Sequence, residues 1–217
     1  RNQQMMRIDA ETVKDLTANE EQALFDRIAA YILQEKPDVL LLEDYNKGVL
    51  TQHLISEIVQ LCKKQGVITT VDPKKKNFFA YKGVDIFKPN LKEVKEGLNL
   101  SLDKIELAQL SDVHQRLQKE LQHSISFITL SEKGVFVQQN DQSLLIPSHI
   151  RNIADVSGAG DTVIAVASLV YAATKNIELF AAVANIAGGL VCEEVGTAAI
   201  NKEKLLEECK LLLSYPA

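Results

Sequence analysis

A short run of small and acidic residues, Asp155-Val156-Ser157-Gly158-Ala159-Gly160-Asp161, combines the residue types needed for phosphoryl transfer. An apolar helix predicted to start near Thr162 follows it. The backbone N–H groups of Gly158, Ala159 and Gly160 can turn toward a ligand, and a helix N-terminus favours anions. Asp161 is placed to accept the proton of an attacking hydroxyl. The run therefore predicts a site where turn amides stabilise a moving phosphoryl group and Asp161 is the base.

The same run has a second interpretation, a glycine-containing turn whose aspartate caps the following helix. The motif alone leaves both interpretations open. It is not a dinucleotide fingerprint, because its glycine spacing differs from G-x-G-x-x-G and no strand leads directly into it. A Rossmann oxidoreductase would need that fingerprint after its first strand, so this class is disfavoured.

Four short apolar runs predict strands, and helical spacing fills the segments between them. This alternation predicts an α/β fold, with a doubly wound, mostly parallel sheet and helices on both faces. Ligands bind beyond the carboxyl ends of such strands, so the polar residues that follow them are expected to face one cleft. The predicted strands are 39–42, 67–71, 84–87 and 125–130, the helices 20–36, 50–64 and 103–121, and the polar residues Asp44, Asp72, Asn90 and Ser131.

The second half of the chain changes pattern. Between Gly134 and Pro147, two short β-type segments flank Asn140-Asp141, which predicts a hairpin. After Asp155 the chain is almost entirely helical in pattern. Because there is no internal repeat, low-complexity tract or linker, residues 1–217 are predicted to form a single domain.

Composition narrows the class of function. The formal net charge is −5 and the basic residues are dispersed, so the sequence does not predict a nucleic-acid partner. Cys62, Cys192 and Cys209 are far apart, as expected for free thiols in a reducing cytosol. The apolar runs are shorter than the roughly 20 residues that span a bilayer, and no signal peptide is apparent. We therefore expect a cytoplasmic protein, without a membrane partner, that acts on small molecules.

The segment from Asp155 to Asp161 resembles the C-terminal signature of the ribokinase-like (PfkB) carbohydrate kinases. Lys88-Pro89-Asn90-Leu91-Lys92-Glu93 is similar to the Asn-x-x-Glu element of this family. The resemblance implies that Asn90, Leu91, Lys92 and Glu93 lie at the nucleotide, and that Asn90 and Glu93 hold Mg²⁺ and the ATP phosphates, largely through water. Oxygen ligands three residues apart at a helix start suit Mg²⁺. The alternative interpretation is a capping box on that helix.

Three further segments resemble the family and imply binding residues. Ser131 and Gly134 match a strand-to-turn nucleotide contact, although Ser131 stands where many relatives have glycine; a plain β-turn is the alternative. Asn185 and Gly188 match the wall beside the adenine, with close helix packing as the alternative. Asp155, the backbone at Ser157 and the stretch near Gly196 resemble loops that bind a monovalent cation, which implies K⁺ as a cofactor beside ATP and Mg²⁺.

A narrower resemblance is to the heptose 7-phosphate kinases of ADP-heptose synthesis. It implies transfer of the ATP γ-phosphoryl group to the anomeric hydroxyl of D-glycero-D-manno-heptose 7-phosphate, giving the 1,7-bisphosphate for lipopolysaccharide core assembly. Asp44 and Lys47 would then contact the substrate; for Lys47, a solvated turn lysine is the alternative. The resemblance rests on residues 1–9, 44–48, 155–164 and 195–198.

The chain also departs from these kinases at both ends. It opens on Arg1 and a strand-like Met5 to Ile8, so the N-terminal part and the β-lid, with sugar-binding residues, are expected upstream. Relatives dimerise through that lid, which implies a homodimer. The chain ends at Ala217 without the nucleotidyltransferase domain of some relatives. Two alternatives stay open: another ribokinase-like sugar or nucleoside kinase, and a non-catalytic nucleotide-binding module, which the intact 158–161 run disfavours.

Overall fold

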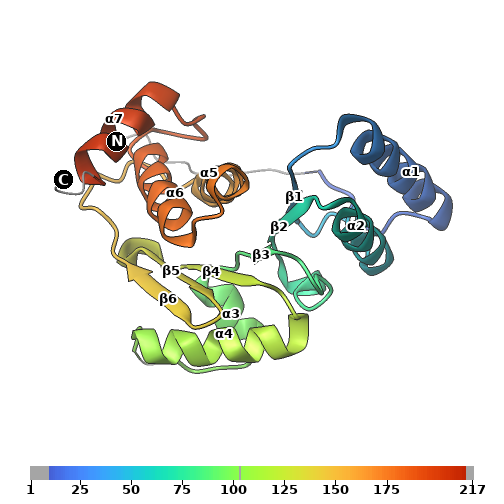
Figure 1. Ribbon diagram of the computed structural model, residues 1–217, viewed down its shortest axis with the longest axis horizontal. Coiled ribbons are helices and arrows are strands. Elements are labelled where there is room, and N and C mark those ends of the chain that lie inside the picture. The colour runs from blue at the N-terminus through green and yellow to red at the C-terminus, as the bar shows by residue number, and fades with distance from the viewer. Residues whose placement is uncertain (1–9, 103, 214–217) are drawn as a thin grey trace.

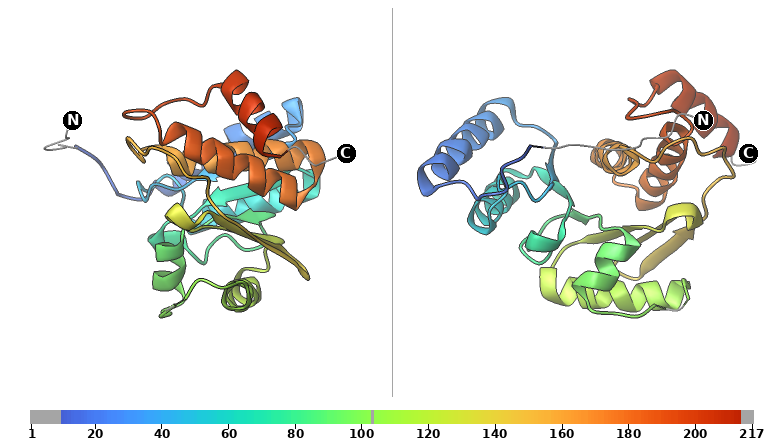
Figure 2. Two further views of the ribbon diagram at one scale, coloured as in Figure 1. Left: turned by 90° about the vertical axis from the view of Figure 1, so that its left-hand side faces the viewer. Right: turned by 180° about the vertical axis from the view of Figure 1, so that it is seen from behind.

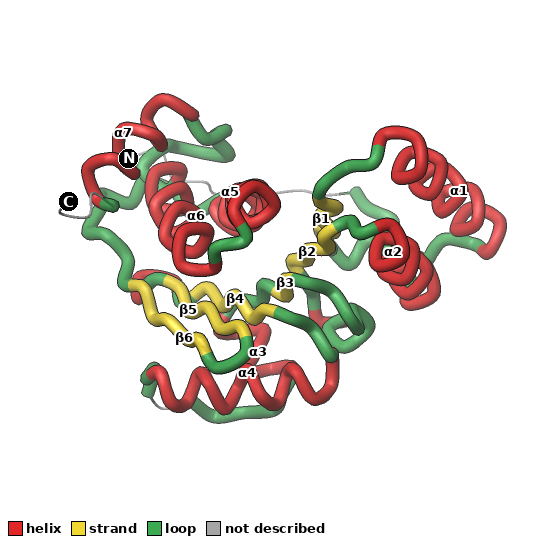
Figure 3. Tube along the Cα trace, in the orientation of Figure 1, coloured by secondary structure: helices red, strands yellow, loops and turns green. Residues whose placement is uncertain are grey.

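Six strands form one sheet in the computed structural model, which describes residues 10–102 and 104–213 (Figures 1 and 3). The strands lie in chain order; β1 to β4 are parallel, and β4, β5 and β6 are antiparallel. The predicted mostly parallel sheet is confirmed, and so is the hairpin around Asn140. The predicted strand Met5 to Ile8 lies outside the described residues. The strands are β1 (Val39–Glu43), β2 (Ile68–Asp72), β3 (Ile86–Phe87), β4 (Ile125–Thr129), β5 (Val135–Gln139) and β6 (Gln142–Ile146).

Helices cover both faces of this sheet, as expected for a doubly wound fold (Figures 1 and 2). The first four helices pack on one face, α5 and α6 pack on the other, and α7 packs on α6. The helices are α1 (Ala18–Glu35), α2 (Gln52–Gln65), α3 (Leu91–Gly97), α4 (Leu107–Leu121), α5 (Ala159–Thr174), α6 (Ile177–Val191) and α7 (Lys202–Leu212), with 3₁₀ turns η1 (Lys75–Asn77) and η2 (Ser131–Lys133).

The alternation of side chains along the strands divides the core in two. Phe87 of β3 joins the cluster under α1 to α4, whereas its neighbour Ile86 joins the cluster under α5 and α6. Strand neighbours point to opposite faces of a sheet, so both must be apolar where both faces are covered. This explains the continuous apolar runs in β1 and β3.

Local sequence fixes several helix ends. Thr51 caps α2 through its hydroxyl, and Gly66 ends that helix with a φ of 71°, as its position predicts. The helix expected from Asp103 begins at Leu107, and Asp103 itself lies outside the described residues. Among the described residues, none of the helices combines the length and apolar character needed to cross a bilayer.

Helix α5 begins at Ala159, earlier than the start expected near Thr162. The reason is Gly158, whose φ of 78° turns the chain directly into the helix. Gly160 and Asp161 therefore lie in the first helical turn. The helix packs on β1 and β2, where Ser168 and Thr70 share a buried hydroxyl–hydroxyl hydrogen bond of 2.7 Å.

Candidate active site

Three carboxylates meet where β1, β2 and the first turn of α5 converge. One oxygen from each of Glu43, Asp72 and Asp161 lies within 4.8 Å of the others. Asp72 was expected at the carboxyl edge of the sheet and Asp161 was predicted as the base, but Glu43 was not among the predicted site residues. Glu43 is the last residue of β1, and strand alternation puts it on the α5 side. Its place at a strand end was the available sequence signal.

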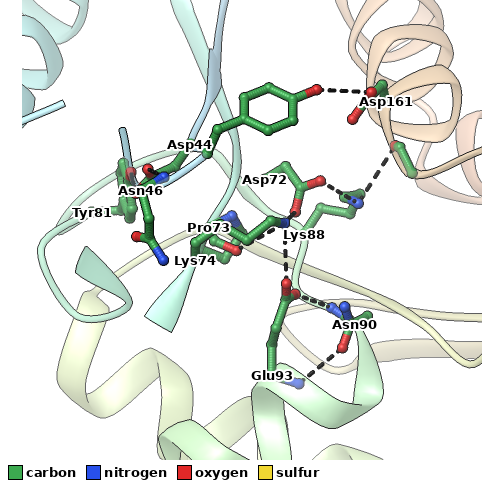
Figure 4. Close-up of polar contacts among 12 residues, drawn as sticks. Asp44, Asn46, Asp72, Pro73, Lys74, Tyr81, Lys88, Asn90, Glu93 and Asp161 are labelled. Atoms are coloured by element: carbon green, nitrogen blue, oxygen red, sulfur yellow. Dashed lines mark hydrogen bonds and ion pairs between the residues drawn. The ribbon is translucent and has the colours of Figure 1, made fainter. Parts of the chain in front are cut away.

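Two lysines neutralise Asp72. The ammonium of Lys88 lies 3.1 Å from Asp72 Oδ2, and that of Lys74 lies 2.9 Å from Oδ1 (Figure 4). The Lys88 side chain is only 3% exposed, so its pairing with Asp72 offsets much of the cost of burying either charge. Lys88 also makes a long, 3.5 Å contact with the Gly160 carbonyl. The first turn of α5 thus lies directly over this buried ion pair.

Of the three carboxyl groups, Glu43 has the environment least favourable to a negative charge. Within the described residues no hydrogen bond or ion pair is found for its side chain. Burial, together with the nearby charges of Asp72 and Asp161, raises the pKa of Glu43 from 4.5 to about 7. A substantial share of Glu43 is therefore protonated at neutral pH.

Asp161 receives a hydrogen bond from across the site. The phenol hydroxyl of Tyr45, in the loop after β1, donates to Asp161 Oδ2 at 2.8 Å. This bond to a carboxylate is the largest cause that raises the pKa of Tyr45 to about 12, so the phenol stays a donor at physiological pH. Sequence reasoning missed Tyr45, because the two residues are 116 positions apart.

The amides of the predicted anion turn are partly available. The Ala159 N–H donates to the Val156 carbonyl at 3.3 Å. For the N–H groups of Gly158, Gly160 and Asp161, no protein acceptor is found in the described part of the chain, as is usual in a first helical turn. Two of the three predicted amides, those of Gly158 and Gly160, therefore remain able to bind an anion.

Asn90 and Glu93 form a reciprocal capping box at the start of α3. Asn90 Oδ1 accepts from the Glu93 N–H, and Glu93 Oε2 accepts from the Asn90 N–H, both at 2.8 Å (Figure 4). The other oxygen of Glu93 lies 3.0 Å from Lys74, which links this element to Asp72. Leu91 and Lys92 open the helix, and the exposed Lys92 pairs with Glu96. The capping interpretation is thus realised in the structure.

Asp44 does not share the cleft that was expected for it. Its buried carboxylate accepts from the Asn46 N–H, the Asn77 amide and the Tyr81 hydroxyl. Tyr81 belongs to the core cluster under α1 to α4, so Asp44 faces away from α5. The reason is strand parity, since Glu43 takes the α5 side and its successor takes the opposite one. Lys47 pairs with Glu11.

The remaining predicted nucleotide residues have clear local roles. Ser131, in η2, has a φ of 57°, a conformation that glycine adopts without strain. Gly134 has a φ of 95°, and an added Cβ there would lie 2.0 Å from the Ile146 carbonyl oxygen, so the hairpin itself requires glycine. Asn185 donates to the Pro147 carbonyl at 2.9 Å. Gly188 packs against Val163, which matches the close-packing interpretation.

Asp155 is hydrogen-bonded to the other two residues expected near a monovalent cation, Ser157 and Gly196. Its carboxylate accepts from the backbone and hydroxyl of Ser157 and from the Gly196 N–H. Hydrogen bonds from Ser157, and more weakly from Gly196, lower the pKa of Asp155 and keep it ionised. The loop before α5 is thereby joined to the loop after α6.

Comparison with known proteins places these features in a family. The model of the pfkB family carbohydrate kinases matches residues 6–204. The bifunctional protein HldE of Sulfurimonas denitrificans is 32% identical over 206 residues, covering 95% of this chain and 42% of that protein. The bifunctional protein HldE of Methylobacillus flagellatus is 36% identical over 211 residues, again covering 95% of this chain and 42% of that protein. The chain thus spans less than half the length of these relatives.

Solved structures share the fold. Phosphofructokinase-2 from Escherichia coli, in complex with potassium, has a TM-score of 0.80 at 16% identity, with 92% of this chain and 64% of that chain covered. Ribokinase from Arabidopsis thaliana, complexed with ribose and ATP, has a TM-score of 0.70 at 16% identity, with 89% and 59% covered. The predicted ribokinase-like fold is therefore confirmed.

Proposed function

Because the chain belongs to the pfkB family of carbohydrate kinases, we propose that Asp161 is the base that takes the proton of a sugar hydroxyl during phosphoryl transfer from ATP. The observation that carries this proposal is the placement of Asp161 in the first turn of α5. The amides of Gly158 and Gly160, for which the described residues provide no acceptor, lie in the same turn. A carboxylate and an anion-binding turn are thus held side by side, as an attacking hydroxyl and a phosphoryl group require.

For the acceptor we propose the anomeric hydroxyl of D-glycero-D-manno-heptose 7-phosphate. Support comes from the resemblance of residues 44–48, 155–164 and 195–198 to heptose 7-phosphate kinases, together with the identity to proteins named HldE. Lys47 is the proposed phosphate ligand. Since it pairs with Glu11, an incoming phosphate must compete with that carboxylate. Asp44 has its carboxylate engaged and is proposed to support the loop that carries Lys47.

We propose that Mg²⁺ enters with ATP near Asn90 and Glu93. Both offer oxygen atoms, which Mg²⁺ prefers, but these oxygens already accept hydrogen bonds and Glu93 also pairs with Lys74. The arrangement fits contact through water, as Mg²⁺ commonly keeps several waters. Bound Mg²⁺ would neutralise phosphate charge. Lys74 and Lys88 supply the protein's own positive charge beside the site.

A monovalent cation site is proposed where Asp155 joins Ser157 to Gly196. The ionised Asp155 supplies negative charge, and backbone carbonyls of the two loops are suitable ligands. The fold neighbour from Escherichia coli was solved with potassium. If the site binds K⁺, replacing K⁺ by a bulky organic cation should lower turnover in wild type but not in Asp155→Asn, which should already be slow. Equal turnover of the wild type in both salts would contradict the proposal.

The function is tested by ADP release with Mg²⁺, ATP and a panel of acceptors: heptose 7-phosphate, fructose 6-phosphate, ribose and a nucleoside. We expect turnover with the heptose phosphate. Asp161→Asn should lower kcat by roughly 10²- to 10⁴-fold with nucleotide affinity within a few-fold of wild type. Asp141→Asn, in the exposed β5–β6 turn, is the matched control and should leave kcat unchanged. A folded Asp161→Asn protein with near wild-type turnover would refute the role of this carboxylate.

A further inference from the structure

We propose that Tyr45 is a positioning residue for Asp161, and that the loop of residues 44–48 is built to hold it in place. This inference rests on the proposed function, since it assigns the role of Tyr45 through Asp161. The two residues come from opposite parts of the chain. Tyr45 follows β1, whereas Asp161 lies in the first turn of α5, and their hydrogen bond of 2.8 Å bridges the site.

The hydroxyl, rather than the ring, accounts for Tyr45 being at this position. The residue is 54% exposed, so hydrophobic burial contributes little to holding it there. Its hydroxyl nevertheless reaches Asp161 Oδ2. A tyrosine that is largely in water but bonded to one carboxylate oxygen is placed for that bond.

In the described part of the chain, the bond from Tyr45 is the hydrogen bond found for the Asp161 carboxylate, and it restricts rotation of that group. An aspartate has two side-chain torsions, and ordering it during the reaction costs conformational entropy. With Oδ2 held by Tyr45, the second oxygen, Oδ1, is the one left for the acceptor hydroxyl. A base held in one orientation before the substrate arrives needs less reorganisation in the transition state.

The loop that carries Tyr45 is anchored on both sides of it. On the N-terminal side, Asp44 accepts hydrogen bonds from the Asn46 N–H at 2.8 Å, Asn77 Nδ2 at 3.2 Å and the Tyr81 hydroxyl at 2.7 Å. Tyr81 is fully buried, so this anchor belongs to the core. Asn77 also donates to the Leu50 carbonyl at 2.7 Å, which fixes the segment beyond the loop.

The C-terminal side of the loop is held by Gly48. Its carbonyl accepts from the Leu16 N–H at 3.0 Å, and its φ is 79°. A Cβ added to Gly48 would lie 1.9 Å from the Lys14 carbonyl oxygen, so only glycine allows this close approach. Tyr45 therefore projects from a short segment fixed at both ends.

The surroundings of the Tyr45–Asp161 bond favour the protonated phenol. Glu43 of β1 and Asp72 of β2 face it with Asp161, while Lys74 and Lys88 neutralise Asp72. The bond to Asp161 is the largest of the effects that raise the pKa of Tyr45 to about 12. Tyr45 therefore stays a hydrogen-bond donor throughout the pH range in which a kinase operates.

The test is Tyr45→Phe, with Tyr31→Phe on the exposed side of α1 as the matched control. Because Tyr45→Phe removes the hydrogen bond to Asp161 but keeps the ring, we expect kcat to fall by roughly tenfold or more, with KM for ATP unchanged. Tyr31→Phe should match wild type. Both proteins should melt within a few degrees of wild type, because both rings are largely exposed. Unchanged kcat in Tyr45→Phe would overturn the inference.

A double mutant separates this inference from the proposed function. If Tyr45 acts through Asp161, Tyr45→Phe should cause no further loss in an Asp161→Asn background. Loss of turnover in Asp161→Asn with normal turnover in Tyr45→Phe would refute only the inference. Normal turnover in Asp161→Asn would refute the proposed function. Crystal structures of wild type and Tyr45→Phe give a readout independent of turnover: the Asp161 carboxylate should rotate or become disordered, and an unchanged carboxylate would overturn the inference.

Discussion

At the scale of single residues, the charge at the site depends on which carboxyl group carries a proton. Asp72 is paired with Lys74 and Lys88, and Asp161 is hydrogen-bonded to Tyr45. Glu43 has neither kind of partner among the described residues, and its pKa is raised to about 7. Like charges at this separation repel, so the proton resides where it is least costly. Glu43 is thus the carboxyl group most sensitive to pH near neutrality.

Glu43→Gln should therefore stabilise the protein at alkaline pH. The folded state holds a proton on Glu43 that the unfolded state releases near pH 4.5, so the Glu43 contribution to stability falls as pH rises from 4.5 through 7. Because Glu43 is half-buried and partly screened by solvent, we expect a gain of only about 1 kcal/mol at pH 8 and almost none at pH 4.5. Urea unfolding of both proteins at the two pH values measures this difference.

Glu203→Gln, on the exposed face of α7, is the control for removing a negative charge. It should shift stability equally little at both pH values. If Glu43→Gln behaved like this control, the raised pKa of Glu43 would be wrong.

At the scale of elements, the packing of α5 on α6 fixes the direction of the helix that carries Asp161. Gly188 of α6 faces Val163 of α5, and an added Cβ at Gly188 would lie 2.6 Å from Val163 Cγ2. Both residues are buried, Val163 in the cluster under α5 and α6. The two helices approach this closely because glycine has no side chain at the contact. Since Val163 comes two residues after Asp161 in α5, strain at the Gly188–Val163 contact would shift the helical turn that carries Asp161.

Gly188→Ala should destabilise the protein by about 1–2 kcal/mol, because overpacking outweighs the better helix propensity of alanine. Adding Val163→Ala makes room for the new methyl group. The double mutant should thus be more stable than the sum of the single changes predicts, by roughly 1 kcal/mol. Denaturant unfolding of the four proteins measures this coupling. The pair Gly188→Ala and Val166→Ala is the control and should be additive; additivity of the first pair would contradict the contact.

At the scale of the whole molecule, one buried polar cluster lies between α4 and the sheet. The hydroxyl of Ser126 on β4 bonds to His114 Nδ1 at 2.9 Å and to His123 Nε2 at 2.6 Å. A hydroxyl can donate to one imidazole and accept from the other, so one serine can partner both rings. Burial lowers the pKa of both histidines, and with the help of His114 it lowers that of His123 to about 3.

The protein should therefore lose stability in mild acid. Both histidines are neutral when folded, whereas in the unfolded chain they bind protons near pH 6.5. Their contribution is complete above pH 6.5 and falls as pH drops toward the folded pKa, by at most about 1.4 kcal/mol per pH unit for each ring. Urea unfolding between pH 7.5 and 5 should show this loss. His123→Gln should reduce the dependence of the unfolding free energy on pH, and His149→Gln should leave it unchanged. The same pH dependence in both variants would contradict the role given to His123.

Local patterns in the sequence determined most of the elements and the main features of the turn before α5. Gly66 ends α2 and the 155–161 run leads into an apolar helix, as predicted, and the capping box stated as the alternative for Asn90 and Glu93 starts α3. These features depend on residues within a few positions of one another. Hydrophobic spacing and backbone freedom act over that range, so they can be read along the chain.

Only the tertiary structure decided which side chains meet at the site. Glu43 and Asp44 are both acidic and adjacent, but their side chains lie on opposite faces of the sheet. Glu43 lies near Asp161, whereas Asp44 accepts a hydrogen bond from the Tyr81 hydroxyl. A shift of one residue reverses the face of a strand, and packing of the whole sheet sets that parity. The Tyr45–Asp161 bond depends on how α5 packs on β1 and β2. Contacts between distant residues depend on the packed geometry of several elements at once, which no local pattern in the sequence specifies.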